Sequence, residues 1–180
     1  MLREEGLEIS TTRLAAALEV KRPTLLYHFP SRAHVIEAAL EDLLTQQALH
    51  VLQVVNRETH PLRRLDAQLR AVHAFHHGRE ERIVFLSQAV ATLGQARMAN
   101  VIAVGNQVFE LHRKAQADRV RAGIEAGTVA PCDVDALMAL LRAAMDGLVV
   151  QRVMTGVELA PVHDFIWRHV LEPLVLEAGG

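Results

Sequence analysis

Apolar side chains recur mostly every third or fourth residue along this chain, and Gly and Pro residues separate the periodic stretches. That spacing puts apolar residues on one side of an α-helix, so it predicts an all-α fold. One long stretch starts after Ser31, the expected N-cap, and reaches about Asn56. Its apolar positions are Val35, Ala39, Leu43, Leu44, Val51, Val54 and Val55. Aromatic residues make up only 4% of the chain and no stretch alternates as a strand would, which argues against a sheet.

The same periodicity predicts the remaining helices. We expect them over about 11–18, 22–29, 62–77, 79–93, 96–126, 134–154 and 161–176. Asp133 is the expected N-cap of the penultimate helix, and Pro161 is expected in the first turn of the last one. The apolar stripe expected for the helix over 96–126 consists of Val101, Val104, Val108, Leu111, Ala115, Val120 and Ile124.

The segment from Ser10 to Ile36 has the pattern of a helix-turn-helix, in which two short helices with buried inner faces flank a tight turn. In the first helix we expect the buried residues to be Leu14, Ala15 and Leu18. Glu19 and Val20 supply the turn, with Val20 pointing inward. In the second helix the expected inward residues are Leu25, Leu26 and Phe29.

The charge of this segment differs from that of the whole chain. The chain carries a net charge of −2, which excludes a generally polycationic nucleic-acid binder. Between Arg13 and Arg32, however, four cations stand against the single acid Glu19, a local charge of 4 − 1 = +3. The cations are Arg13, Lys21, Arg22 and Arg32. This patch is either a solvated surface cluster or a contact surface for DNA phosphates.

The run from Thr24 to Arg32, T-L-L-Y-H-F-P-S-R, resembles the signature of the TetR family of transcriptional regulators, T-L-Y-x-H-F-x-S-K. Leu14 and Ala15 stand at the spacing of that family's upstream Ile-Ala pair. The resemblance implies an N-terminal helix-turn-helix DNA-binding domain over residues 1–44. It also implies a C-terminal helical domain over 45–180 that binds a ligand and forms a homodimer.

The chain departs from the family pattern at three places. Glu19 stands where the turn usually has Gly, so the turn must avoid a positive φ or be strained. Leu26 replaces a Tyr, for which the neighbouring Tyr27 compensates in part. The family has a longer first helix, whereas only residues 1–5 precede Gly6 here. Without that helix Leu14, Leu18 and Leu25 would be partly exposed, so we expect either a true start upstream of Met1 or a partly disordered head.

The resemblance also implies which residues contact DNA. Lys21 and Arg22, at the start of the second helix, would reach the bases of the major groove. Phosphate contacts are implied for Thr24, Tyr27, His28, Arg13 and Arg32. Each of these residues has the alternative of being an ordinary solvated side chain. Two heads would bind a palindromic operator, most commonly as a repressor.

The last two helices are apolar on more than one side, which indicates either a dimer interface or a fully internal core helix. Ala143, Ala144 and Gly147 are small enough for a partner helix to approach closely. The resemblance places a small-molecule effector, expected to be hydrophobic, inside the C-terminal domain. The candidate lining residues are Phe75, Phe85, Gln88, Val104, Gln107, Phe109, Met145 and Trp167, each of which has ordinary core packing as its alternative.

Other functions find less support in the sequence. His73, His76 and His77 could present two imidazoles on one helix face to a metal, but no Glu-x-x-His motif accompanies them, and we expect no metal site. There is no nucleophile or phosphate-binding motif, so we expect neither enzymatic activity nor a cofactor. A second hypothesis is a dimeric helical ligand-binding or interaction module with a non-functional head.

The expected location is the cytoplasm, at the nucleoid. Cys132 is the only cysteine, which excludes an internal disulfide and suits a reducing compartment. The apolar region from Val134 to Met154 is interrupted by Arg142, Asp146 and Arg152, so we expect no membrane span.

Overall fold

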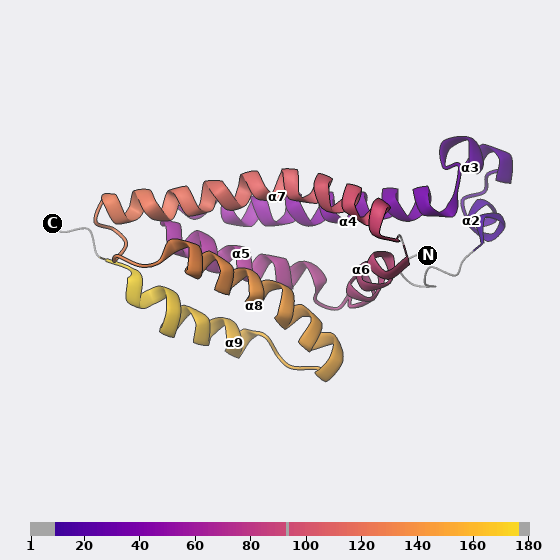
Figure 1. Ribbon diagram of the computed structural model, residues 1–180. Helices are drawn as coiled ribbons and strands as arrows, with labels where there is room; N and C mark the ends of the chain where they lie inside the picture. Colours follow the sequence, from indigo (N-terminus) through magenta and orange to yellow (C-terminus); the bar gives the residue numbers. More distant parts are fainter. Residues whose placement is uncertain (1–9, 93, 177–180) are drawn as a thin grey trace. The chain divides into compact units, whose positions relative to one another are not determined.

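The computed structural model describes residues 10–92 and 94–176, without the side chains of residues 90–109. Within these ranges the regular structure is helical, apart from one isolated antiparallel bridge between Val129 and Val175 (Figure 1). The all-α expectation is therefore confirmed. The expected remnant of a first helix, residues 1–5, lies outside the described residues.

The chain divides into two compact units. The first comprises Met1–Gln46 and Arg79–Asn106, and the second comprises Gln47–Gly78 and Gln107–Gly180. The helices, in chain order, are α2 (Thr11–Ala17), α3 (Arg22–His28), α4 (Arg32–Val55), α5 (Pro61–His76), α6 (Glu81–Thr92), α7 (Gly94–Glu125), α8 (Val134–Thr155) and α9 (Ala160–Ile166). The helix α4 begins directly after Ser31, whose carbonyl accepts from the amide of Val35.

In the first unit, α2 and α3 pack on a small apolar core. The side chain of Ser10 caps α2 by accepting from the amide of Arg13 at 3.2 Å. Leu14, Ala15 and Leu25 are buried as expected, with half-buried Phe29 against them. This core holds the two helices together and leaves most of the surface of α3 to solvent.

Two expectations for the head are wrong. Leu18 is 60% exposed and Val20 is 39% exposed, although both were expected to point inward. The reason is that α2 ends at Ala17, before its apolar pattern does. Leu18 is already the C-cap, and Val20 lies in the loop where the helical spacing no longer applies.

The turn between α2 and α3 adopts a strained backbone conformation. Glu19 has φ +54°, and among the described residues other than glycine it alone has a positive φ. Its amide donates to the carbonyl of Ala16 at 3.1 Å, and the amide of Val20 donates to the carbonyl of Ala15 at 3.0 Å. These two bonds form a Schellman motif, which normally has Gly at the position of Glu19. The left-handed conformation costs a residue with a Cβ about 1–2 kcal/mol.

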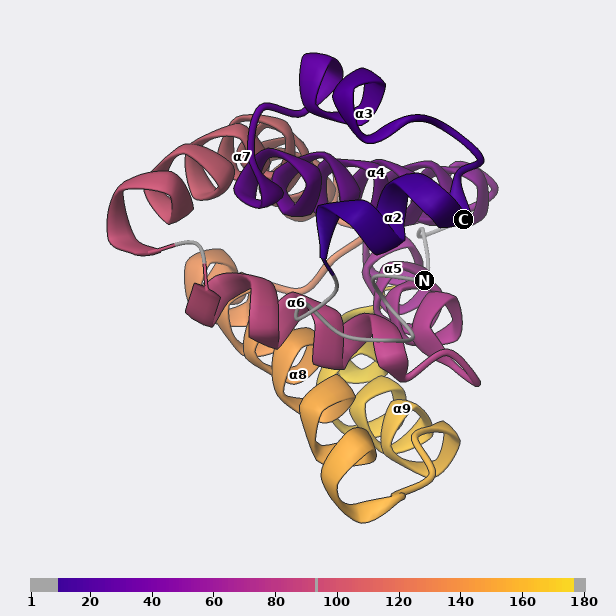
Figure 2. The ribbon, with the colours of Figure 1, turned by 90° about the vertical axis from the view of Figure 1, so that its right-hand side faces the viewer.

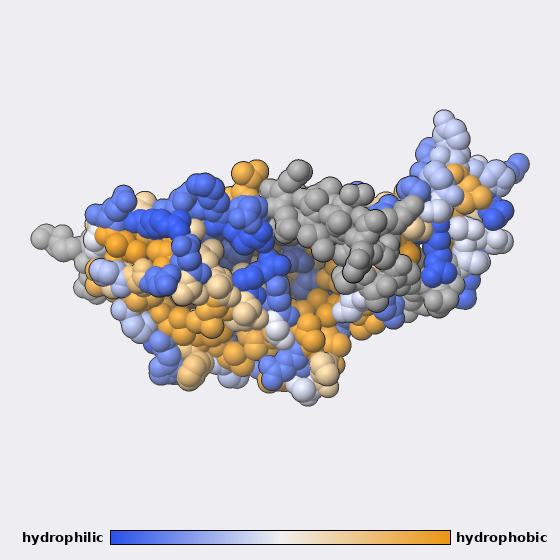
Figure 3. Space-filling view, in the orientation of Figure 1, coloured by the Kyte–Doolittle hydropathy of each residue, from blue (hydrophilic) through white to orange (hydrophobic). Residues whose placement is uncertain are grey.

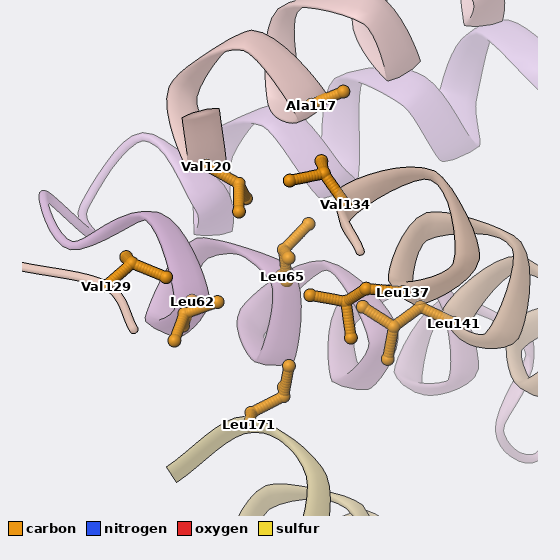
Figure 4. Packing of buried hydrophobic residues seen from close by; sticks show 9 residues of the cluster. All are labelled: Leu62, Leu65, Ala117, Val120, Val129, Val134, Leu137, Leu141 and Leu171. Atoms are coloured by element: carbon orange, nitrogen blue, oxygen red, sulfur yellow. The ribbon is translucent and has the colours of Figure 1, made fainter. Parts of the chain in front are cut away.

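The core of the second unit gathers around α5, which packs against α8 and α9 (Figures 1 and 2). Figure 4 shows Leu65 of α5 directed between Val120 of α7 and Val134 of α8. The buried cluster consists of Leu62, Leu65, Ala117, Val120, Val129, Val134, Leu137, Leu141 and Leu171. Asp133 is the N-cap of α8, as expected, and accepts from the amide of Ala136 at 2.9 Å.

Two expectations for the second unit need correction. The last α-helix ends at Ile166 instead of reaching residue 176, and a π-helical turn (Trp167–Leu171) and a 3-10 turn (Glu172–Leu174) follow. Pro173 is the reason, because it has no amide hydrogen and disfavours α-helix in the preceding turn. Leu111 is 74% exposed because it lies half a turn away from the face of α7 that buries Val120.

No helix among the described residues is both long and apolar enough to cross a membrane.

Replacing Glu19 with Gly is expected to raise the free energy of unfolding by about 1 kcal/mol, because Gly accepts a positive φ without steric cost. Urea denaturation followed by circular dichroism measures the change. The matched control is Ala17→Gly at the last residue of α2, which should lower the free energy of unfolding by up to about 1 kcal/mol. A Glu19→Gly protein that is less stable than the parent would mean that the turn is not strained.

Candidate nucleic-acid interface and effector cavity

The outer surface of α3 is polar and open to solvent. Lys21 and Arg22 stand at its start, and both are exposed. Thr24 and His28 are exposed too, and Tyr27 is 83% exposed. Because Leu25 is the one fully buried residue of α3, the helix presents the rest of its surface outward.

Local contacts fix the orientation of this surface. The guanidinium Nε of Arg22 donates to the hydroxyl of Thr11 on α2 at 3.4 Å, which ties the start of α3 to its neighbour. The rings of Tyr27 and His28 lie edge to face, with their centroids 5.2 Å apart. Pro23 in the first turn of α3 pre-sets the helical φ there.

The other two expected DNA-contacting residues lie on the flanking helices. Arg13 is exposed on α2, and Arg32 is the half-buried first residue of α4. None of the helices α2, α3 and α4 has an acidic residue in its first turn. Within these first turns no carboxylate offsets the positive ends of the helix dipoles, which favours anions there.

The residues expected to line an effector site do not form one group. Phe85 is buried and Gln88 exposed in the first unit, to which Val104 also belongs. In the second unit Phe75 lies against the His50 ring, and the Arg63 guanidinium lies 5.3 Å above the Trp167 ring. The side chains of Val104, Gln107 and Phe109 lie outside the described residues. Of the described candidates, Met145 alone borders the cavity found in the second unit.

That cavity is bordered by side chains from α5, α7 and α8. Its described lining consists of Leu65, Gln68, His112, Arg113, Met138, Leu141, Arg142 and Met145. Its volume is about 30 Å³, the space of no more than a few water molecules. Most of these residues were not predicted from the sequence, although Met138, Leu141 and Met145 follow the helical spacing of one face of α8.

A polar cluster adjoins the cavity. The side-chain oxygen of Gln68 accepts from the amide of Gln116 at 3.3 Å and from the ring Nε2 of His112 at 3.2 Å. Gln116 is only 1% exposed, so this hydrogen bond is made inside the core. Burial lowers the pKa of His112, and the positive charges of Arg119 and Arg64 lower it further, so the ring is neutral at pH 7.

A pair of buried histidines, His73 and His163, joins α5, α8 and α9. The ring Nε2 of His73 donates to the carbonyl of Met145 at 2.9 Å. Its Nδ1 must then accept, and it lies 2.7 Å from the Nε2 of His163. The two rings stack with their centroids 4.9 Å apart. Burial, followed by the charges of His73 and Arg70, lowers the pKa of His163 to about 4.

These contacts involve part of the helix face that carries His73, His76 and His77, where no metal site was expected. His73 uses both ring nitrogens on protein partners, and the Nε2 of His76 lies 3.1 Å from the side-chain oxygen of Gln47. Among the described residues, no three His, Cys, Asp or Glu side chains are grouped as a metal site requires.

Solved structures share this arrangement of helices. The ketosteroid transcriptional regulator KstR2 of Mycobacterium tuberculosis matches over 98% of this chain and 90% of its own, with 23% identity and a TM-score of 0.66. The TetR-family transcriptional regulator PfmR from Thermus thermophilus matches over 94% and 93%, with 19% identity and a TM-score of 0.69. The chain has the TetR-family fold.

This chain also matches the structure of AibR, which was solved in complex with isovaleryl coenzyme A and operator DNA. It covers 94% of this chain and 91% of its own, with 16% identity and a TM-score of 0.65. The superantigen PfiT overlaps as well, over 97% and 89% with 18% identity and a TM-score of 0.73, so function must be argued from the residues of this chain. The sequence matches no protein-family model and no curated protein.

The histidine pair should make the stability of this TetR-family fold depend on pH. Both pKa values are lowered by folding, so the unfolded chain binds protons more readily than the folded chain. The free energy of unfolding is therefore unaffected by these histidines above pH 6.5, and it decreases as the pH falls from 6.5 towards 4. For His163 the loss reaches about 3 kcal/mol.

Urea denaturation between pH 7.5 and 4.5 measures this loss. Titration of the carboxylates also contributes, so the comparison is with His163→Asn, which keeps a hydrogen-bond donor and cannot titrate. The variant should lose less stability on acidification than the parent. Equal losses would show that the pair does not titrate as its burial implies.

Proposed function

We propose that this chain is a DNA-binding transcriptional regulator, a repressor that a small-molecule effector releases from a palindromic operator. The observation that carries the proposal is the exposed basic and polar face of α3, held out by the small core of Leu14, Ala15 and Leu25. The likeness to transcriptional regulators, one of them solved with operator DNA, supports the proposal. The action is binding, so the chain is not an enzyme.

The roles of the DNA-contacting residues follow from their places in the helix-turn-helix. Lys21 and Arg22 read base edges in the major groove, where a guanidinium can pair with both acceptors of guanine. Thr24, Tyr27 and His28 hold phosphates, and the exposure of Tyr27 leaves its hydroxyl accessible to them. Arg13 and Arg32 grip the flanking backbone.

The proposed functional division is a DNA-binding domain over residues 1–44 and a ligand-binding and dimerisation domain over 45–180. A single head binds weakly, so two heads must engage the two halves of the operator together. The protein acts in the cytoplasm, associated with the nucleoid.

The homodimer forms through α8 and α9. Both helices expose large apolar side chains, and Figure 3 shows apolar surface gathered over them. The exposed residues are Leu140, Val150, Val153, Met154 and Phe165. On α8 the exposed Gly147 has open space where a Cβ would stand, which lets a partner helix approach closely. An apolar face of this kind is costly to leave in water.

Arg22→Ala and Tyr27→Ala are expected to weaken binding to the chain's own promoter DNA by about tenfold or more each, while the dimer survives. Fluorescence anisotropy at several salt concentrations measures the effect, and the logarithm of affinity should fall steeply with that of salt. The matched control is Arg57→Ala, an exposed arginine in the second unit. Unchanged affinity in both head variants would contradict the DNA-binding role of α3. It would favour the second hypothesis, a helical ligand-binding module with a non-functional head.

Leu140→Glu and Phe165→Glu are expected to weaken the dimer by about 30-fold or more, because each charge enters a twofold-symmetric interface twice. Both side chains are exposed in the single chain, so the fold should tolerate the changes. Sedimentation equilibrium measures the association. Leu111→Glu, at an exposed leucine of α7, is the control that should stay dimeric. A dimer that dissociates only in the control would place the interface elsewhere.

A further inference from the structure

The cavity of the second unit has two chemically different walls. Leu65 and Leu141 are buried and apolar, and Met138 and Met145 are half-buried. An aliphatic chain that enters between them removes apolar surface from water on both sides. Methionine side chains are unbranched and adapt their shape, so the space between the helices can widen for a guest larger than the present volume.

The other wall is polar and cationic. Arg113 of α7 and Arg142 of α8 border the cavity, and the described lining contains no acidic side chain. The neutral ring of His112 and the amide of Gln68 are the remaining polar groups there. Positive charge extends behind them, because Arg64 and Arg119 are the charged groups that act on His112.

Both lining arginines are paired in ways that an incoming anion can replace. Arg113 binds Glu110 one turn earlier, and Arg142 donates from Nε to Asp146 at 2.6 Å one turn later. Glu110 and Asp146 are 67% and 61% exposed, so both ion pairs are close to water. Exposed pairs of this kind contribute about 0–1 kcal/mol, and the carboxylates regain full hydration when they are released.

We propose that this cavity binds an aliphatic ligand with one anionic group, such as a straight-chain carboxylate. The alkyl chain lies among the leucines and methionines, and the anion is held by the guanidinium groups of Arg113 and Arg142. The inference rests on the proposed function in taking this ligand as the effector, and it adds one anionic group to the hydrophobic effector expected from the sequence. The two arginines repel an amine of the same length. An alcohol contacts the apolar wall but offers the arginines no negative charge.

Isothermal titration calorimetry with octanoate, 1-octanol and octylamine on the full-length protein tests the proposal. Octanoate should bind at least about tenfold more tightly than the other two. In the Arg113→Gln, Arg142→Gln double variant the affinity for octanoate should fall about tenfold, to that of octanol, while octanol binding is unchanged. The control is Arg121→Gln, because Arg121 also pairs with exposed carboxylates but does not line the cavity.

The place of binding is checked by the methyl resonances of the five methionines, assigned by single Met→Leu variants. Octanoate should shift those of Met138 and Met145. No binding of octanoate, equal binding of octanol, an equal loss in the Arg121 variant, or shifts confined to other methionines would each overturn the proposal.

Promoter binding by the ligand-free protein is measured on the same preparation. If the protein binds the promoter but fails these tests, only this inference is overturned. If it binds octanoate but not the promoter, only the proposed regulatory function is overturned.

Discussion

Burial of one face of α5 is the constraint on which the second unit depends. Leu62, Leu65 and Leu69 recur at the spacing of one helical face, and all are almost completely buried. They meet α8 and the chain that follows α9, so a single helix organises the core. Because the same face continues to His73, the polar contacts of the interior are placed by the helix that supplies the apolar ones.

Several buried polar groups of this unit are hydrogen-bonded to one another, and these bonds make its interior specific. Gln116 is hydrogen-bonded to Gln68, and His73 spans from the Met145 carbonyl to His163. A buried polar group that loses its partner costs about 1–3 kcal/mol. A shift of α5 by one residue along its neighbours would break several of these hydrogen bonds at once and is therefore unfavourable. The polar pairs therefore fix which faces meet, while the leucines supply most of the stabilisation.

The sequence predicted the helices well because their signals are local. The N-cap at Asp133, the limits of α5 and the buried residues Leu14 and Leu25 depend only on nearby spacing and capping chemistry. The errors at Leu18 and Val20 arose where a helix ended before its apolar pattern did. The cavity lining escaped prediction because it is shared by three helices, and no single-helix pattern tells which polar side chains, such as Gln68 and His112, turn inward.

The helix α8 connects ligand binding and dimerisation, the two properties proposed for the second unit. Its residues Met138, Leu141 and Met145 border the cavity, whereas Leu140 and Gly147 lie on the opposite side of the same helix and are exposed. A ligand that separates α8 from α5 and α7 therefore moves the very surface that is proposed to meet the partner. A helix transmits such a movement as a rigid rod, since its backbone hydrogen bonds resist local bending. The ligand can then change the affinity for DNA only by the difference between its affinities for the two dimer arrangements, and tight binding without that difference would regulate nothing.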